Sequence, residues 1–160
     1  YFISIYYLQR QQFIRAPMNE VWAFFYHKKP LYELTPRYMN LQITSSHVPE
    51  HIYPGQIITY KVSPLLGVPL SWMTEITHVR NLELFVDEQR HGPYAIWHHE
   101  HHFKQQDGGV MMTDIVHYKL PLAFLGRMAH LLFVKRQLDN IFDHRYKKIE
   151  TLYANHSQHF

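Results

Sequence analysis

The stretch from Pro93 to Pro121 constrains the fold more than any other, because apolar and polar side chains alternate on both sides of a Gly-containing turn. Such alternation predicts two strands joined as a β-hairpin. With Asp107-Gly108 as a two-residue turn, a set of cross-strand pairs shares one face, since side chains alternate along a strand. These pairs are Trp97 with Tyr118, His99 with Val116, His101 with Asp114, and Phe103 with Met112. Imidazoles and a carboxylate among apolar residues suit the wall of a cavity with polar spots.

The chain before this hairpin begins with a predicted strand and two short helices. Residues 1–15 are rich in Tyr, Ile and Phe and predict a strand, which ends at Ala16-Pro17. Proline is tolerated in the first turn of a helix, so Pro17 is expected to open the first helix. A second short helix is expected over Pro30–Leu34, because the residue before Pro36 disfavours helical backbone.

Four more strands are predicted between these helices and the hairpin. They cover residues 38–47, 56–63, 70–79 and 82–90, with a loop at 63–69. The last two form a second hairpin around Arg80-Asn81, which would pair Ile76 with Phe85, Thr74 with Asp87 and Trp72 with Gln89. A three-residue loop, His91-Gly92-Pro93, would then set Asp87 beside Trp97 and Phe85 beside His99.

After Pro121 the apolar spacing becomes helical, and one helix is expected over about 125–154, or about 45 Å at 1.5 Å per residue. An antiparallel sheet with one buried face needs a cover, and this helix is the only element long enough. The sequence therefore predicts an α+β fold in the order β-αα-ββββββ-α. A curved antiparallel seven-stranded sheet would wrap around the long C-terminal helix, as a single domain over 1–154 with a polar tail at 155–160.

Several short motifs add a family resemblance through their order and spacing. They are Ala16-Pro17, Glu20-Val21-Trp22, Leu34-Thr35-Pro36, Gly55-Gln56-Ile57, Trp72-Met73-Thr74, Phe85-Val86-Asp87, Gly92-Pro93-Tyr94, Trp97-His98-His99-Glu100-His101 and Thr113-Asp114. Together they resemble the SRPBCC superfamily, also called the START-like or helix-grip fold and including polyketide cyclases, and most closely a bacterial ligand-binding SRPBCC group. The resemblance implies a ligand cavity between sheet and helix, with access guarded by Pro64–Pro69 and His91–Pro93.

Alternation and resemblance together imply which side chains face this cavity. From the sheet these are Tyr60, Trp72, Thr74, Phe85, Asp87, Gln89, Tyr94, Trp97, His99, His101, Asp114, Val116 and Tyr118, and from the helix Leu125, Met128 and Leu132. The aromatic members also fit an ordinary core, and both interpretations stay open.

The ionisable members suggest pairs, because an isolated buried charge is costly. His101 beside Asp114 is one expected pair, and Asp87 near His99 is another. They fit a structural hydrogen-bond network, recognition of the polar end of a ligand, or general acid–base catalysis by His99, His101 and Asp114. No G-x-S-x-G motif and no cysteine supplies a nucleophile, so binding is favoured over catalysis.

A metal is the remaining chemical alternative. His99 and His101 project to the same side of a strand, and Asp114 offers a third ligand for zinc or non-haem iron. The opposite face offers His98, Glu100 and His102 at the same spacing. Because H-x-H arises readily by chance among 14 histidines, we expect neither a metal nor another cofactor.

Composition narrows the function further. The net charge of +3 comes from scattered residues, which does not suit nucleic acid binding. No apolar run approaches the ~20 residues of a bilayer span, so stable membrane insertion is not expected. The absence of cysteine fits a reducing compartment, and we expect a cytoplasmic protein. The sequence thus favours carriage of a small hydrophobic molecule, such as a lipid, aromatic or polyketide-like compound. The alternatives are a cyclase/dehydratase-type enzyme and a structural or regulatory partner domain whose cavity is vestigial, and the oligomeric state stays open.

Overall fold

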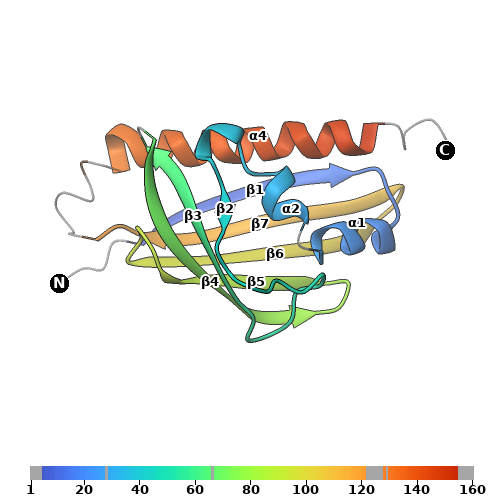
Figure 1. Cartoon of the computed structure of the whole chain (residues 1–160). Helices are drawn as coiled ribbons and strands as arrows, with labels where there is room; N and C mark the ends of the chain where they lie inside the picture. The colour runs from blue at the N-terminus through green and yellow to red at the C-terminus, as the bar shows by residue number, and fades with distance from the viewer. Residues whose placement is uncertain (1–4, 28, 66, 122–127, 129, 155–160) are drawn as a thin grey trace.

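The computed structural model describes residues 5–27, 29–65, 67–121, 128 and 130–154. A seven-stranded antiparallel sheet curves beneath a long C-terminal helix (Figure 1). The predicted α+β helix-grip architecture is therefore confirmed. Leu125 and the predicted polar tail at 155–160 lie outside the described residues. No helix of the described part is long and apolar enough to cross a membrane.

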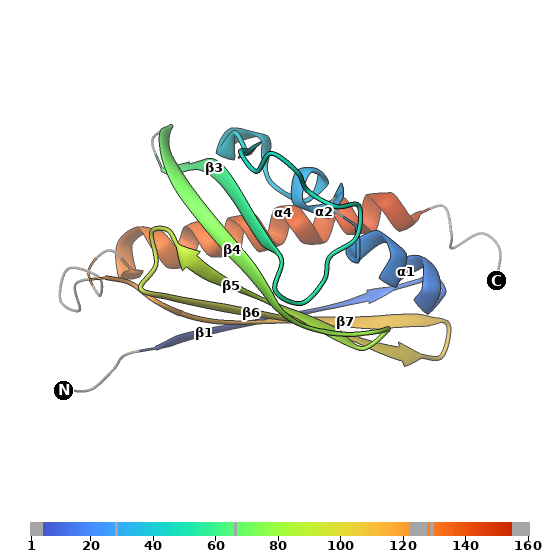
Figure 2. The ribbon, with the colours of Figure 1, turned by 60° about the horizontal axis from the view of Figure 1, so that its bottom comes forward.

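The sheet has the strand order β1-β7-β6-β5-β4-β3-β2, so the first strand pairs with the last. The strands are β1 (Tyr6–Ile14), β2 (Gln42–Ile43), β3 (Ile57–Leu65), β4 (Val68–Arg80), β5 (Leu84–His91), β6 (Ile96–Gln106) and β7 (Gly109–Lys119). The helical elements are α1 (Met18–Phe25), α2 (Lys29–Glu33), the 3-10 helix η1 (Arg37–Met39), the π-helix η2 (His130–Val134) and α4 (Lys135–Tyr153). The short helices α1 and α2 lie on the side of the sheet that faces α4 (Figures 1 and 2).

The hairpin of β6 and β7 has the predicted register throughout. Trp97 pairs with Tyr118, His101 with Asp114, and Gln106 with Gly109. Gly108 provides the positive φ of 76° that the turn requires. Gly109 is needed for another reason: a Cβ there would collide with the backbone carbonyl oxygen of Ile14 on β1.

The core lies in two clusters that fix α4 against the sheet. In the first, Val21, Trp22 and Phe25 of α1 pack with Phe85 and Phe103 of the sheet, and Ile149 of α4 joins them. In the second, Leu138 and Phe142 of α4 pack on Leu8, Val116 and Tyr118 of β1 and β7. The helix therefore rests on one side of the sheet and on α1, which leaves room over the remaining strands.

The predicted strand over 38–47 is wrong in most of its length. Its start forms η1, and Asn40 then turns the chain with a left-handed φ of 46°. Only Gln42–Ile43 pairs as a strand, against β3. The following backbone N–H groups of Thr44 and Ser45 both donate to the carbonyl oxygen of Thr59. Alternating side chains alone did not reveal the left-handed residue.

The predicted loop at 63–69 is also wrong, because β3 continues to Leu65 and β4 starts at Val68. Gly67 has the positive φ of 70° that a turn this tight uses. The register shifts between Val62 and Leu65, where one strand bulges. The two strands thus form an extended arm in place of the expected loop.

Two predicted registers are wrong around β5. Thr74 pairs with Gln89, where Asp87 was expected, because the β4–β5 ladder contains two irregularities. Asp87 pairs with His99, where Trp97 was expected, because the chain between His91 and Ile96 is longer than a three-residue loop. Both of these errors amount to two residues, and a two-residue shift leaves a side chain on its own face. Nearer the turn, Phe85 pairs with Val79, three residues from the expected Ile76, because the ladder is irregular between Ile76 and His78.

Candidate functional site

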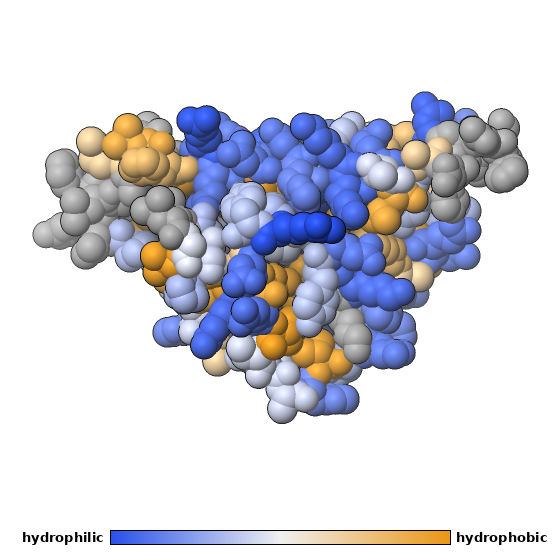
Figure 3. Space-filling view, turned by 45° about the horizontal axis from the view of Figure 1, so that its top comes forward, coloured by the Kyte–Doolittle hydropathy of each residue, from blue (hydrophilic) through white to orange (hydrophobic). Residues whose placement is uncertain are grey.

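A cavity of about 560 Å³ lies between the inner face of β3–β6 and α4. Its wall is mostly aromatic and aliphatic. The members include Phe25, Leu34, Met39, Ile52, Ile58, Tyr60, Trp72, Phe85, Tyr94, Trp97, Leu138, Ile141 and Phe142. Figure 3 shows hydrophobic side chains between hydrophilic ones on the face seen there. A pocket of this size and character is typical of sites for small, mainly apolar molecules.

Ionisable groups lie in one part of the wall and directly behind it, and they are here called the buried polar cluster: Asp87, His99, His101, Asp114 and Arg145. His101 lies between two carboxylates, with Nε2 at 2.8 Å from Oδ2 of Asp87 and Nδ1 at 3.0 Å from Oδ1 of Asp114. His99 Nε2 lies 2.9 Å from the same Asp114 oxygen. The two imidazole rings lie against each other, with centroids 3.8 Å apart.

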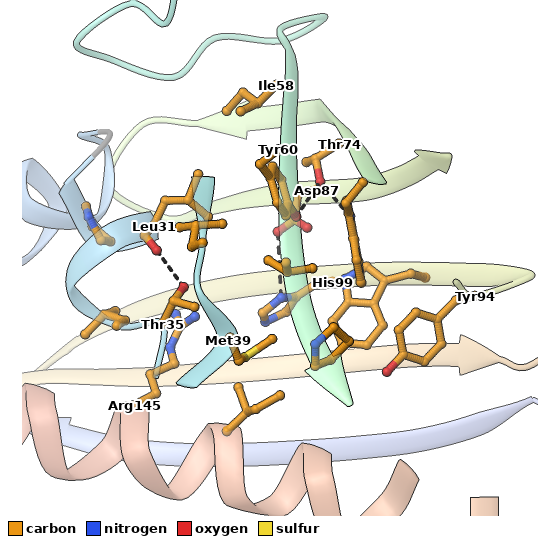
Figure 4. A pocket seen from close by; sticks show the side chains of 18 of the residues that line it. Leu31, Thr35, Met39, Ile58, Tyr60, Thr74, Asp87, Tyr94, His99 and Arg145 are labelled. Carbon is orange, nitrogen blue, oxygen red and sulfur yellow. Dashed lines mark hydrogen bonds and ion pairs between the residues drawn. The ribbon is translucent and has the colours of Figure 1, made fainter. Parts of the chain in front are cut away.

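Three adjacent strands and one helix build the buried polar cluster. Asp87 on β5 pairs with His99 on β6, and His101 pairs with Asp114 on β7, so all four side chains share the inner face. Arg145 reaches down from α4, where it follows Phe142 by three positions on the face that packs on the sheet. Its Nη2 lies 3.3 Å from Oδ1 of Asp114. Figure 4 shows Asp87, His99 and Arg145 around the same space.

The cluster balances its own charges. Burial disfavours ionisation of Asp114, but the charge of Arg145 and the hydrogen bonds from His101 and His99 outweigh it, so the pKa of Asp114 lies well below its usual range. Burial also opposes ionisation of Asp87, but the hydrogen bond from His101 and the nearby positive charges keep its pKa low. Two carboxylates are therefore present at neutral pH, as buried charges require partners.

The pKa values of the two histidines are shifted in opposite directions by their surroundings. Burial opposes the charged form of His101, but hydrogen bonds to Asp114 and Asp87 outweigh burial and raise its pKa. For His99, burial and the charge of His101 together lower the pKa despite the bond to Asp114. The shifts favour the charged form of His101 and the neutral form of His99, and a charged His101 together with Arg145 would balance the two carboxylates.

A second polar spot lies on β3 and β4. The Tyr60 hydroxyl and Thr74 Oγ1 are 3.2 Å apart, and the indole N–H of Trp72 donates to Thr74 over 3.1 Å. The rings of Tyr60 and Trp72 stack with centroids 6.0 Å apart. Burial raises the pKa of both Tyr60 and Tyr94 because the phenolate would lose its hydration.

These buried phenols predict a loss of stability in alkali. The folded state holds the neutral form of Tyr60 and Tyr94 above the ordinary phenol pKa of about 10, so stability is full below that pH and falls as the pH rises further. In a spectrophotometric titration, a fraction of the tyrosines should ionise only above the ordinary phenol pKa. This late ionisation should coincide with loss of the near-ultraviolet circular dichroism. The late fraction should shrink in Tyr60→Phe and Tyr94→Phe, and an unchanged late fraction in both variants would contradict the prediction.

Two buried donors in the cavity wall have no partner within the described residues. They are Nε2 of Gln56 and Nε of Arg145. Gln56 is only 2% exposed, and its Oε1 already accepts from the backbone N–H of Tyr53. Unpaired buried donors cost free energy, so these are places where a bound acceptor would stabilise the protein.

Most of the side chains predicted from the sequence lie in the cavity wall. They are Tyr60, Trp72, Thr74, Phe85, Asp87, Tyr94, Trp97, His99 and His101. Asp114 lies behind the two histidines, and Val116 and Tyr118 pack against α4. Gln89 holds the loop before β6 instead, through hydrogen bonds with the backbone of Tyr94. The roles of all these residues in ligand binding stay predictions.

The prediction that Met128 and Leu132 cap the cavity is wrong, because their side chains are 50% and 59% exposed. The helix covers the cavity through later residues: Val134, Gln137, Leu138, Ile141, Phe142 and Arg145. The π-helical turn η2 precedes α4 and changes which residues face inward, since a π-turn departs from the regular helical period. Arg145 was missed as a member of the site, although its place in an apolar stripe was a usable signal.

A metal ion would find a different ligand set here from the predicted one. One ligand atom each from Asp87, His99 and His101 lies within 4.8 Å of the others. Asp114 was expected to be the third metal ligand. Its Oδ1 instead contacts Nε2 of His99 and Nδ1 of His101, the ring nitrogens that point away from Asp87.

Comparisons with known proteins establish the fold. No protein-family model matches the sequence, nor does any curated protein. Among solved structures, the chain is similar to protein Ms6760 from Mycobacterium smegmatis, with 17% identity, a TM-score of 0.66 and coverage of 93% of this chain and 91% of the other. It is also similar to the ginseng major latex-like protein 151 from Panax ginseng, with 12% identity, a TM-score of 0.63 and coverage of 93% and 97%.

A third similar structure is larger. The nucleoside-diphosphate sugar epimerase from Corynebacterium glutamicum matches with 23% identity and a TM-score of 0.61 over 89% of this chain, but over only 28% of the epimerase. At these identities the likeness concerns the fold alone.

Proposed function

We propose that this chain, which has the helix-grip fold of SRPBCC-type proteins, binds a small, mostly apolar molecule in the cavity between its sheet and α4. The observation that carries the proposal is the cavity of about 560 Å³ with its aromatic and aliphatic wall. This volume lies within the range of about 300–1,000 Å³ that is usual for sites of small organic ligands.

The ligand should also carry an acceptor atom. Most polar groups of the cavity wall already have partners inside the protein, such as His101 with Asp87 and Trp72 with Thr74. The unpaired groups, Gln56 Nε2 and Arg145 Nε, are both donors. A carbonyl, hydroxyl or acidic oxygen on the ligand would satisfy them, whereas a pure hydrocarbon would leave them unpaired. An aromatic or polyketide-like compound with such oxygens, or a lipid with a polar end, fits both requirements.

The geometry favours binding over the cyclase/dehydratase alternative. A general base needs a free nitrogen lone pair within reach of its substrate. Both nitrogens of His101 lie within 3.0 Å of carboxylate oxygens, and His99 Nε2 is held by Asp114. His101 therefore has no free lone pair, and the remaining imidazole nitrogen, Nδ1 of His99, lies 3.7 Å from Oδ2 of Asp87.

Filling the cavity should weaken binding without unfolding the protein. Ile58 on β3 and Ile141 on α4 both line the cavity, so Ile58→Trp and Ile141→Trp would place an indole in the space of the ligand. We expect binding of an anilinonaphthalene sulfonate probe, which is apolar with one acidic group, to weaken at least tenfold, or about 1.4 kcal/mol. Fluorescence titration measures this, and native mass spectrometry of the protein purified from its host would reveal a co-purified molecule.

Matched controls are available next to both positions. Ile57 on β3 is 44% exposed and Tyr146 on α4 is 45% exposed, so Ile57→Trp and Tyr146→Trp add the same ring outside the cavity. They should bind the probe like the parent protein. If the two inward variants remain folded by circular dichroism and still bind with parental affinity, the cavity is not the binding site.

A further inference from the structure

We propose that Asp87, His99 and His101 form a binding site for a divalent first-row transition metal ion, with its open coordination positions toward the cavity. This goes beyond the proposed binding of an organic molecule. It rests on the arrangement of the side chains and not on the identity of that ligand.

The distances around Asp87 suit a metal. Its Oδ2 lies 2.8 Å from Nε2 of His101 and 3.7 Å from Nδ1 of His99, and the three residues offer ligand atoms within 4.8 Å of one another. A zinc ion bound at about 2.1 Å in tetrahedral geometry keeps its ligand atoms about 3.4 Å apart. The two contacts of Asp87 bracket that spacing, and all three ligand atoms lie within 4.8 Å of one another, so an ion would draw them together around itself. Two imidazoles and a carboxylate form a common ligand set for zinc and for non-haem iron.

The second layer of side chains supports the same assignment. Metal-bound histidines usually donate their other N–H to a carboxylate, which fixes ring orientation and tautomer. Here one oxygen, Oδ1 of Asp114, lies 2.9 Å from His99 Nε2 and 3.0 Å from His101 Nδ1. Both rings can therefore place a proton on the Asp114 side and a lone pair on the Asp87 side. Arg145 Nη2 lies 3.3 Å from the same Oδ1 of Asp114 and 3.3 Å from Nδ1 of His101, so it holds the carboxylate against the rings.

Charge and access also favour a cation. A divalent ion that binds Nε2 of His101 would displace the proton from that nitrogen. With both imidazoles neutral, two carboxylates and Arg145 then leave one net negative charge in a buried place, which the ion offsets. Asp87, His99 and His101 all line the cavity, so the positions not taken by protein atoms face its interior. Three protein ligands with open positions characterise metal sites that bind a further molecule, in contrast to closed structural sites.

The outer face of the same strand provides an internal control. His98, Glu100 and His102 follow one another at the same two-residue interval as His99 and His101, but they face away from the cavity, and the two histidine side chains are 33% and 38% exposed. His98 lies between two carboxylates, with Nδ1 at 2.6 Å from Glu88 and Nε2 at 3.3 Å from Glu100, and His102 Nε2 lies 2.6 Å from Glu100. The described geometry brings no three such groups together there.

The test uses the absence of cysteine from this chain. In Asp87→Cys, the single thiolate of the protein would stand at the proposed site, and one equivalent of Co²⁺ should produce a near-ultraviolet thiolate-to-metal charge-transfer band. Adding His99→Gln should remove the band, whereas adding His98→Gln and His102→Gln should leave it. With the parent protein, calorimetric titration should show one Zn²⁺ or Co²⁺ bound, at least tenfold more weakly after Asp87→Asn.

Several results would overturn the proposal. One is a folded parent protein that binds no stoichiometric Co²⁺ or Zn²⁺. Another is binding that survives Asp87→Asn and His99→Gln but disappears with His98→Gln and His102→Gln. If His99→Gln does not fold, the charge-transfer band of folded Asp87→Cys still decides. These readouts are independent of probe binding in the Ile58 and Ile141 variants, so the metal site and the organic ligand can fail separately.

Discussion

Replacement of Arg145 by methionine is expected to lower the free energy of unfolding by about 3–5 kcal/mol, the range for removing one partner of a buried ionic network. The guanidinium is the main source of the low pKa of Asp114 after the opposing effect of burial. The Arg145 side chain is 16% exposed and that of Asp114 is 3% exposed, so solvent screens their contact weakly. Methionine keeps much of the volume and removes the charge, which leaves a carboxylate without its cation.

Chemical denaturation of Arg145→Met and of Lys147→Met measures this effect. Lys147 is an exposed cation on the same helix, and its loss should change stability by less than about 0.5 kcal/mol. Asp114→Asn combined with Arg145→Met should be less destabilising than the two single losses added, because the groups contact each other. A loss below about 1 kcal/mol for Arg145→Met, with a normal Lys147→Met control, would show that the network does not need this cation.

Alanine at Gly109 is the second substitution with a large expected effect. Its Cβ would collide with the carbonyl oxygen of Ile14, a backbone atom that moves only if β1 moves. Overpacking of this kind costs about 1–3 kcal/mol. The loss should appear as a lower midpoint of denaturation, because the β1–β7 ladder includes the pair of Ile14 and Val110 next to the clash.

The neighbouring Gly108 separates this effect from a general need for glycine. It has a positive φ of 76°, but nothing lies near the place of its Cβ. Asparagine tolerates this backbone region well, so Gly108→Asn should cost less than about 1 kcal/mol. The explanation fails if Gly108→Asn is more damaging than Gly109→Ala.

The hairpin of β6 and β7 shows why part of the fold can be predicted from the sequence. A two-residue turn sets the register of both strands, and alternation then assigns each side chain to a face. The contact between His101 and Asp114 follows directly. The pairing of Asp87 with His99 was placed two residues away, yet the two side chains were correctly expected near each other, because a shift of two preserves the face.

Other features depend on information that alternation does not contain. The irregularities that shift the β4–β5 ladder leave no mark in the pattern, and neither does the left-handed Asn40. The inward face of the last helix was misplaced at Met128 and Leu132, because a π-helical turn precedes α4. Arg145 was not among the predicted site residues, since its partner Asp114 comes from a strand far away in the sequence. The size of the cavity depends on how far α4 stands from the sheet.

The order of strands in the sheet has a consequence for folding during protein synthesis. The first strand, β1, has only the last strand as its neighbour, and Tyr6 pairs with Tyr118 roughly a hundred residues later. During synthesis, β1 therefore emerges long before its partner exists. The apolar residues of β1 stay unpaired with β7 until the ribosome has synthesised that strand. We expect slow, late closure of the sheet, with a nascent chain that depends on chaperones until its final third appears.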